Sequence, residues 1–283
     1  MRKEAVYSGF SAQKKQTNAA CPGKGYRMKK AILSVSYGTS DRVQCACTID
    51  RIENLYRHTF PDCEICRAFT SKSVINALHK VGNHVDTVSE ALDRLCAAGF
   101  DEIYVQPTHV IAGGEFDSIC DEVRLRIDCF KRLCVGKPLL DSVEDSEYIC
   151  RFFAEELENT NRALVLVGHG SAHPENEKYT LLQTTAKRLG YGSIFVMTLE
   201  ASPSARDILP RIRDAGYKSV LLTPLLFGAA GHARRDMAGD GPNSVASILR
   251  AGGLDVECLV KGLGEYDAIA ARYLEHLRRA MTE

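Results

Sequence analysis

The sequence lacks an excess of charge of either sign and any long apolar segment. Lys and Arg number 36, as do Asp and Glu, so the formal net charge of the 283 residues is zero. This balance argues against a nucleic-acid binder, which needs a basic excess to neutralise phosphates. No apolar run reaches the ~18 residues that a membrane span requires. With 45% hydrophobic residues, we expect a globular protein of enzyme size that is not attached to a membrane.

A cysteine pattern typical of a zinc site or of a secreted disulfide framework is also missing. The eleven cysteines are scattered without a repeated spacing. Cys63 and Cys66 form one C-x-x-C and Cys45 and Cys47 one C-x-C, but no second pair follows at zinc-binding spacing. We interpret the cysteines as reduced, small apolar residues of a cytoplasmic protein.

The first 27 residues are basic and polar, and no apolar segment follows the basic residues. A secretory signal peptide is therefore not expected. We predict that residues 1–27 form a mobile N-terminal extension, or that Met28 is the natural start.

The remaining sequence alternates apolar strand segments with helical segments, which predicts an α/β fold with parallel sheets. The expected strands are 31–37, 64–69, 102–106, 138–140, 162–167, 193–199, 219–223 and 255–260. The expected helices run from the capping cluster 39–41 to about 57, over 73–81, 88–98, 115–133, 176–189, 203–215, 231–238 and 244–251, and from about 266 to the end.

An internal repeat predicts two similar α/β halves, 28–145 and 146–283, with parallel sheets that face each other across a central cleft. Segment 98–115 corresponds to 215–232, and Ser34–Ser40 corresponds to Leu166–Ala172. Ligands of such folds bind outside the carboxyl ends of the strands.

Three polar side chains follow strands of the second half, where they can converge. His169 and Glu200 come directly after their strands, and His232 follows a glycine-rich segment after the third strand. Two imidazoles and a carboxylate suit a borderline divalent metal, with open positions for exchange. Tyr37 and Glu115 occupy the places of His169 and His232 in the first half, which indicates that the first half grips an organic substrate.

Other interpretations of these residues have weaker support. His169 and His173 form H-x-x-x-H without the glutamate and helical setting of a zincin. A hydrolase could pair Ser171 with His232, but the G-x-S-x-G turn is missing. A phosphate cradle lacks both the Walker lysine pattern and G-x-G-x-x-G.

Several motifs, in the correct order over about 28–280, resemble the anaerobic cobalt chelatase family of cobalamin synthesis. They are Met28–Ser40, Arg67–Ser71, Gln106–Ile111, Gly168–Gly170, Gly231–Ala233 with Asp236–Ala238, and Gly262–Glu265.

The resemblance implies a class II chelatase fold, with two Rossmann-like halves around a tetrapyrrole cleft. It also implies the insertion of Co²⁺ into sirohydrochlorin, or factor II, without ATP. By position in the family motifs, His169, Glu200 and His232 would be the metal ligands and the catalytic groups. Co²⁺ would be a substrate, with no tightly bound cofactor. The final helix is expected to pack on the first half. Assembly into a homo-oligomer stays open.

A ring substrate with many carboxylates also needs polar partners around the cleft. The substrate-binding candidates are Tyr37, Gly38, Thr39, Ser40, His109, Glu115, Arg234 and Arg235. The competing hypotheses are an iron or nickel chelatase on the same scaffold, a tetrapyrrole or metal carrier without turnover, and a two-domain ligand-binding protein.

Overall fold

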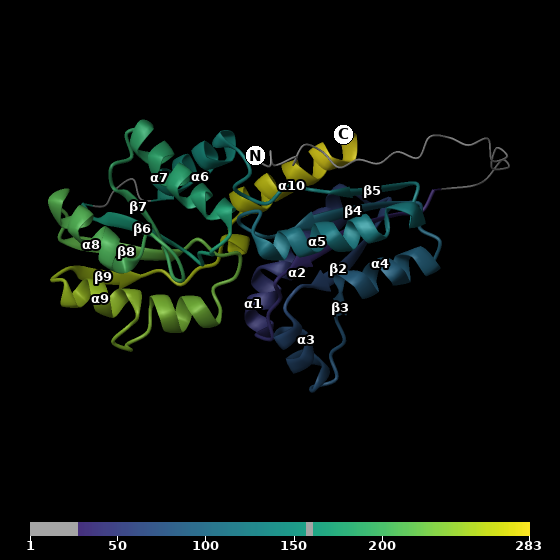
Figure 1. Cartoon of the computed structure of the whole chain (residues 1–283), viewed down its shortest axis with the longest axis horizontal. Coiled ribbons are helices and arrows are strands. Elements are labelled where there is room, and N and C mark those ends of the chain that lie inside the picture. Colours follow the sequence, from purple (N-terminus) through teal and green to yellow (C-terminus); the bar gives the residue numbers. More distant parts are fainter. Residues whose placement is uncertain (1–27, 157–160) are drawn as a thin grey trace, which may run out of the picture.

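The computed structural model describes residues 28–156 and 161–283, and the expected extension 1–27 lies outside the described residues. Two parallel sheets stand side by side, one in each half (Figure 1). The first has the order β3-β2-β1-β4-β5, with strands β1 (Lys30–Ser36), β2 (Cys63–Phe69), β3 (Asp86–Thr87), β4 (Glu102–Pro107) and β5 (Arg132–Val135). The second has the order β7-β6-β8-β9, with β6 (Ala163–Gly168), β7 (Ile194–Thr198), β8 (Ser219–Pro224) and β9 (Asp255–Cys258).

Helices cover both faces of each sheet, as parallel sheets require. They are α1 (Arg42–Cys47), α2 (Ile49–Thr59), α3 (Lys72–His79), α4 (Val88–Ala97), α5 (Gly114–Leu125), α6 (Val143–Glu156), α7 (Glu177–Arg188), α8 (Ala205–Asp214), α9 (Val245–Ala251) and α10 (Asp267–Thr282). Single turns complete the chain: η1 (Ile127–Cys129), η2 (Pro174–Asn176), the π-helical η3 (Ala233–Met237) and η4 (Leu263–Glu265). The α/β class and the parallel sheets are confirmed.

The strand register repeats between the halves. Val35 of β1 pairs with Pro107 of β4, and Val167 of β6 pairs with Pro224 of β8. The internal repeat sets Val35 against Val167 and Pro107 against Pro224. The two halves therefore have the same pairing of their central strands. The carboxyl ends of β6, β7 and β8 consequently lie along one edge of the second sheet.

One apolar core runs through both halves. Ile32 of β1 and Leu164 of β6 belong to the same cluster of buried side chains, together with Leu225 and Tyr273. The last helix, α10, packs against α2, β4 and β5 of the first half (Figure 1), and its Tyr273 hydroxyl donates to the carbonyl of Thr108 at 2.8 Å. The two halves are thus held by shared apolar packing as well as by the chain connections.

Two expected elements of the first half are wrong. The helix predicted over 115–133 ends at Leu125, because Arg132–Val135 pairs with β4 as strand β5. The strand predicted over 138–140 is not one, since Leu139 and Leu140 donate their N–H groups to the loop that follows β4. Tertiary pairing overrides local propensity at both places.

The helix expected up to residue 57 is interrupted. Asp41 caps its start by accepting from the N–H groups of Val43 and Gln44, as the capping cluster predicts. Thr48 then leaves helical geometry, with φ −121° and ψ −74°, and its hydroxyl donates to the Gln44 carbonyl. Competition of a threonine side chain for helical carbonyls accounts for the division into α1 and α2.

The ten cysteines of the described ranges all carry free thiols. Cys63 and Cys66 lie within β2, and burial raises the pKa of Cys66 to about 11 and that of Cys150 to about 12. Such thiols stay protonated and serve as packing groups.

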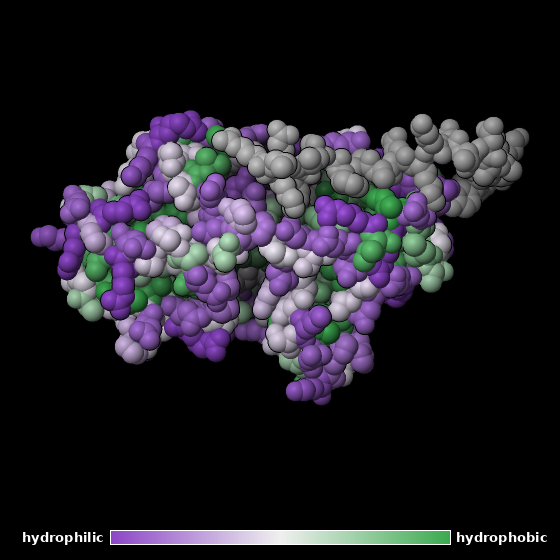
Figure 2. Space-filling view, in the orientation of Figure 1, coloured by the Kyte–Doolittle hydropathy of each residue, from purple (hydrophilic) through white to green (hydrophobic). Residues whose placement is uncertain are grey.

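No helix in the described part of the chain has the length and hydrophobicity to cross a membrane. The visible face of the molecule is mainly hydrophilic, with small apolar patches, and is indented where the halves meet (Figure 2).

Candidate metal centre

The structure brings together the three side chains that follow β6, β7 and β8. One ligand atom each from His169, Glu200 and His232 lies within 4.8 Å of the others. The Nε2 atom of His169 is 3.7 Å from Oε1 of Glu200, and the rings of His169 and His232 meet edge to face at 4.8 Å between centroids. Groups at these separations can close around one divalent ion.

Backbone contacts hold the first two of these residues next to each other. The carbonyl of His169 accepts from the N–H groups of Leu199 at 3.0 Å and Glu200 at 2.8 Å, which ties the ends of β6 and β7 together. Gly170 permits this approach. Its φ is +84°, and a Cβ atom there would lie 2.7 Å from the Cβ of Thr198.

Each histidine has an oxygen partner for Nδ1. In His169 it faces the carbonyl of Gly170 at 3.0 Å, and in His232 it faces Oδ2 of Asp236 at 2.7 Å. A histidine that donates through Nδ1 presents an unprotonated Nε2, which is the form that binds metals. In that tautomer, both rings leave Nε2 free to coordinate a metal ion.

The group is open to solvent. The side chains of His169, His232 and Glu200 are 41%, 43% and 58% exposed. A pocket of about 380 Å³ lies beside Glu200 and His232, between the segment from β7 to α8 and the segment from η3 to α9. Three ligands with open positions suit a site that takes up an ion and gives it away, whereas structural zinc sites are closed by four.

The first-half candidates after β1 form an exposed turn. Tyr37 is 52% exposed, and Gly38 has a φ of +98° with Phe69 so close that any side chain would clash. The hydroxyl of Thr39 accepts from the N–H of Asp41 at 3.1 Å, and Ser40 is exposed. The turn therefore offers an aromatic ring and hydroxyl groups at the carboxyl end of β1.

The other two first-half candidates lie after β4. Both ring nitrogens of His109 are buried and have no hydrogen-bond partner among the described residues. Burial lowers the pKa of His109 to about 4, although the nearby Glu115 acts in the opposite direction. Glu115 itself is exposed in the first turn of α5.

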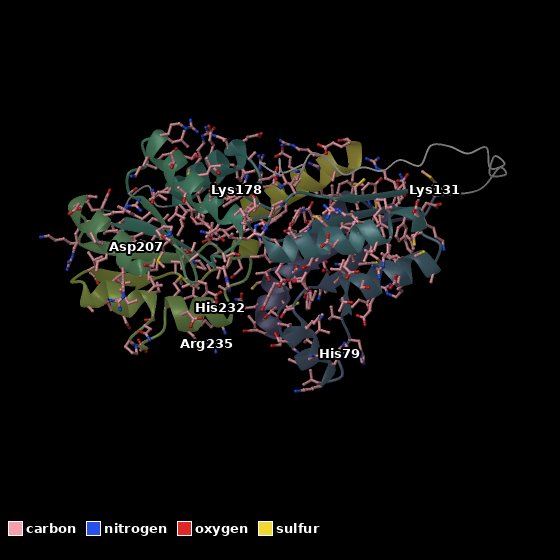
Figure 3. The ribbon with its side chains drawn as sticks, in the orientation of Figure 1. His79, Lys131, Lys178, Asp207, His232 and Arg235 are labelled. Carbon is pink, nitrogen blue, oxygen red and sulfur yellow. The ribbon has the colours of Figure 1, made fainter. Side chains whose placement is uncertain are left out.

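Both arginine candidates lie in η3, directly after His232. Figure 3 shows His232 and Arg235 on the side of the second half that faces α1. Arg234 reaches the first half, where its Nη1 atom pairs with Oδ2 of Asp41 at 3.0 Å. Arg235 bonds within its own segment, to the carbonyl of Gly231 at 3.4 Å.

The structure does not support the H-x-x-x-H metal pair or the Ser171 hydrolase. Nε2 of His173 bonds Oδ2 of Asp117 in α5 at 3.1 Å, so His173 stands outside the metal group. The hydroxyl of Ser171 accepts from the N–H of His173, which places it in a local turn.

A comparison with known proteins identifies the family of this chain. A family model described as "Cobalt chelatase (CbiK)" matches residues 30–282. The chain belongs to the cobalt chelatase family. Two relatives are "Sirohydrochlorin cobaltochelatase" of Salmonella typhimurium, 34% identical over 90% of this chain and 97% of the relative, and "Sirohydrochlorin cobaltochelatase CbiKC" of Nitratidesulfovibrio vulgaris, 32% identical over 90% and 91%.

A solved structure shares the fold of this cobalt chelatase family member. "SirB from Bacillus subtilis with Fe3+" superposes with a TM-score of 0.61 over 89% of this chain and 96% of its own, at 16% identity. The class II chelatase fold and the family resemblance are confirmed.

Sequence reasoning missed the contacts of two acidic residues at the candidate site, Asp236 with His232 and Asp41 with Arg234. Asp236 stands four residues after His232, a helical spacing that could have identified it as a partner. Asp41 was expected only as part of a helix cap. Its contact with Arg234 spans 193 positions, and no local pattern reports such a pair.

Proposed function

We propose that the protein is a sirohydrochlorin cobaltochelatase, which inserts Co²⁺ into sirohydrochlorin or factor II without ATP. The convergence of the two imidazoles and the carboxylate carries the proposal, and the family membership supports it. The metal ion is a substrate, and the reaction requires no tightly bound cofactor. The free thiols of the described cysteines favour a reducing, cytoplasmic setting.

His169, Glu200 and His232 perform the chemistry in this proposal. Their exposed, three-ligand arrangement holds the ion loosely, so the ion can pass to the ring nitrogens. Insertion replaces two pyrrole N–H protons by the metal and therefore releases two protons. Imidazole accepts protons near neutral pH, and the Glu200 carboxylate offsets the charge of the ion.

The opposite half binds the macrocycle. Tyr37 offers an aromatic face, and the turn Gly38–Ser40 offers hydroxyl and backbone groups at the end of β1. Arg234, at the edge next to α1, can pair with a carboxylate of the substrate. Binding the ring bent, with its nitrogen lone pairs tilted towards the ion, favours the transition state over the flat ring.

An anaerobic absorbance assay with sirohydrochlorin and Co²⁺ tests the function. We expect the spectrum of the metallated ring to appear catalytically with the wild-type chain and to disappear with His169→Ala or His232→Ala, while circular dichroism stays unchanged. His58→Ala, an exposed histidine of α2, is the matched control. Near-normal rates in both site variants would refute the site.

The same assay separates the competing functions. Initial rates with Co²⁺, Fe²⁺ and Ni²⁺ identify the preferred metal, because ligand identity alone does not discriminate among these ions. Stoichiometric binding without metallated product would instead indicate a carrier.

A further inference from the structure

The segment 225–230, between β8 and His232, has no regular secondary structure. Neighbouring backbone holds it on one side: Leu263 donates to the carbonyl of Leu226 at 2.8 Å, and Gly264 donates to that of Phe227 at 2.9 Å. The position of His232 depends on these contacts, because His232 lies only a few residues further along the chain.

A residue of the first half holds the same segment on its other side. The Oε1 atom of Gln44, in α1, accepts from the N–H of Ala229 at 2.9 Å, across 185 positions of sequence. Gln44 is 6% exposed and Ala229 is fully buried. A buried N–H group without an acceptor is strongly disfavoured, so this contact determines where the segment runs.

Gln44 is itself held in place. Oδ1 of Asp41 accepts from the N–H of Gln44 at 3.1 Å, which anchors the start of α1. The neighbouring Gly264 packs so tightly that a Cβ atom there would lie 2.9 Å from Thr48 of the first half and from the ring of Phe227. The segment before His232 is therefore enclosed between the two halves.

We propose that Gln44 is a positioning residue for His232, and that it makes the geometry of the metal group depend on the contact between the halves. The inference rests on the proposed function, since it takes His232 as a metal ligand. A displacement of about 1 Å in a ligand is enough to impair a site that requires exact placement. Gln44 acts through Ala229 and touches no reactant.

Co²⁺ alone is the probe, added anaerobically to the full chain, with the visible absorption of the bound ion as the signal. We expect Gln44→Leu, which removes the acceptor at similar size, to weaken Co²⁺ binding about 10-fold and to change the spectrum. Gln44→Glu, which keeps an acceptor on a side chain of equal length, should restore both. In turnover, Gln44→Leu should raise the KM for Co²⁺ more than that for sirohydrochlorin.

Ala46→Gly is the matched control, because it weakens α1 at an exposed position two residues from Gln44. It should bind Co²⁺ as the wild type does. If Gln44→Leu does not fold, Gln44→Asn, which withdraws the acceptor by one methylene, takes its place with the same expected loss.

Wild-type affinity and spectrum in the folded Gln44→Leu or Gln44→Asn protein would overturn the inference. So would an equal loss in Ala46→Gly, or no rescue in a folded Gln44→Glu protein. Failure of the proposed function has a different signature: His232→Ala would then bind Co²⁺ as tightly as the wild type.

Discussion

Among single residues, Asp236 controls the orientation of His232. Its carboxylate lies 2.7 Å from Nδ1, which leaves Nε2 of the imidazole free for a metal ion. We expect Asp236→Asn to weaken Co²⁺ binding about 10-fold, because partners of this kind raise the basicity of the ligand and fix its tautomer. A Co²⁺ titration followed by calorimetry measures the loss. Asp240→Asn, at an exposed position shortly after η3, should leave the affinity unchanged. Equal affinities in the wild type and both variants would contradict this role of Asp236.

His109 makes the stability of the fold depend on pH. Its pKa falls from 6.5 to about 4 on folding because burial disfavours the charged ring. The unfolded chain therefore binds more protons between these values, and stability is lost as the pH falls from 6.5 towards 4. At pH 5 the free energy of unfolding is lower by about 2 kcal/mol than at pH 7.5 because of His109.

Replacing His109 by leucine should remove that acid sensitivity. Urea unfolding at pH 7.5 and pH 5 measures it: the free energy of unfolding should fall about 2 kcal/mol less in His109→Leu than in the wild type. An equal fall in the free energy of unfolding of both proteins would show that His109 is protonated at pH 5 as readily in the folded state as in the unfolded state.

Among the helices and strands, the sequence predicts those elements that have a local pattern of their own. Buried apolar segments predict the strands, and the residues directly after them, His169 and Glu200, are recognisable because strands of one sheet end at one edge. The strand β5 and the helix α6 were missed: β5 exists through its pairing with β4, and α6 begins only after the turn at Ser142.

Contacts between distant segments are the part that no local pattern predicts. Gln44 meets Ala229 and Asp41 meets Arg234 across 185 and 193 positions. Each residue has an ordinary local explanation, as a helix residue, a cap or an exposed arginine. Only the three-dimensional arrangement shows that α1 supports the segment of His232.

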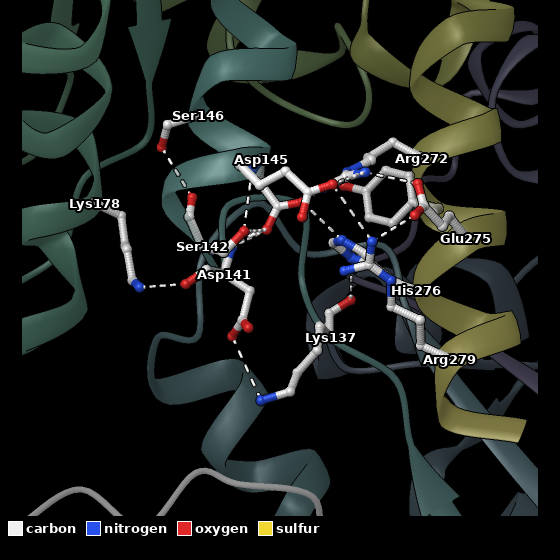
Figure 4. A network of polar contacts seen from close by, with 12 residues as sticks. Lys137, Asp141, Ser142, Asp145, Ser146, Lys178, Arg272, Glu275, His276 and Arg279 are labelled. Atoms are coloured by element: carbon white, nitrogen blue, oxygen red, sulfur yellow. Dashed lines mark hydrogen bonds and ion pairs between the residues drawn. The ribbon is translucent and has the colours of Figure 1, made fainter. Parts of the chain in front are cut away.

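Helices α6 and α10 are joined by a buried ionic network (Figure 4). Asp145 bonds Nε of Arg272 at 2.7 Å and Nε2 of His276 at 2.8 Å, and it caps α6 through Ser142. Burial alone would raise the pKa of Asp145, but hydrogen bonds from His276, Ser142 and Arg272 hold it well below its usual range. The stability from this carboxylate is present above pH 3.8 and is lost at lower pH.

Arg272→Met should destabilise the protein by about 3–5 kcal/mol, because it leaves a buried carboxylate without its arginine partner. Both side chains are at most 4% exposed, so water cannot replace the arginine. Urea unfolding at pH 7 provides the measurement. Arg278→Met, on the exposed side of the same helix, should change stability by less than about 0.5 kcal/mol. Similar losses of stability in the two variants would show that any substitution in α10 has this effect, and that the contact of Arg272 with Asp145 is not its cause.

Because the net charge of the whole molecule is zero, a polyanionic substrate must be attracted by individual positive side chains. Arg234 is such a side chain, and it pairs with Asp41 of the first half. The N–H groups of Gln44 and Val43, together with Arg234, keep the pKa of Asp41 below its usual value, so Asp41 is ionised at neutral pH and competes with a substrate carboxylate for Arg234.

This competition predicts opposite effects of the two partners on substrate binding. Arg234→Gln should raise the KM for sirohydrochlorin about 3- to 5-fold, within the range of an exposed charged contact. Asp41→Asn should lower it about 2-fold, since asparagine still caps α1 but no longer occupies the arginine by charge. Steady-state kinetics at saturating Co²⁺ distinguish the cases, with Arg278→Gln as a control for the loss of one positive charge. If the pair served only to hold the halves together, both variants would raise the KM, because either one would separate the two sides of the substrate site.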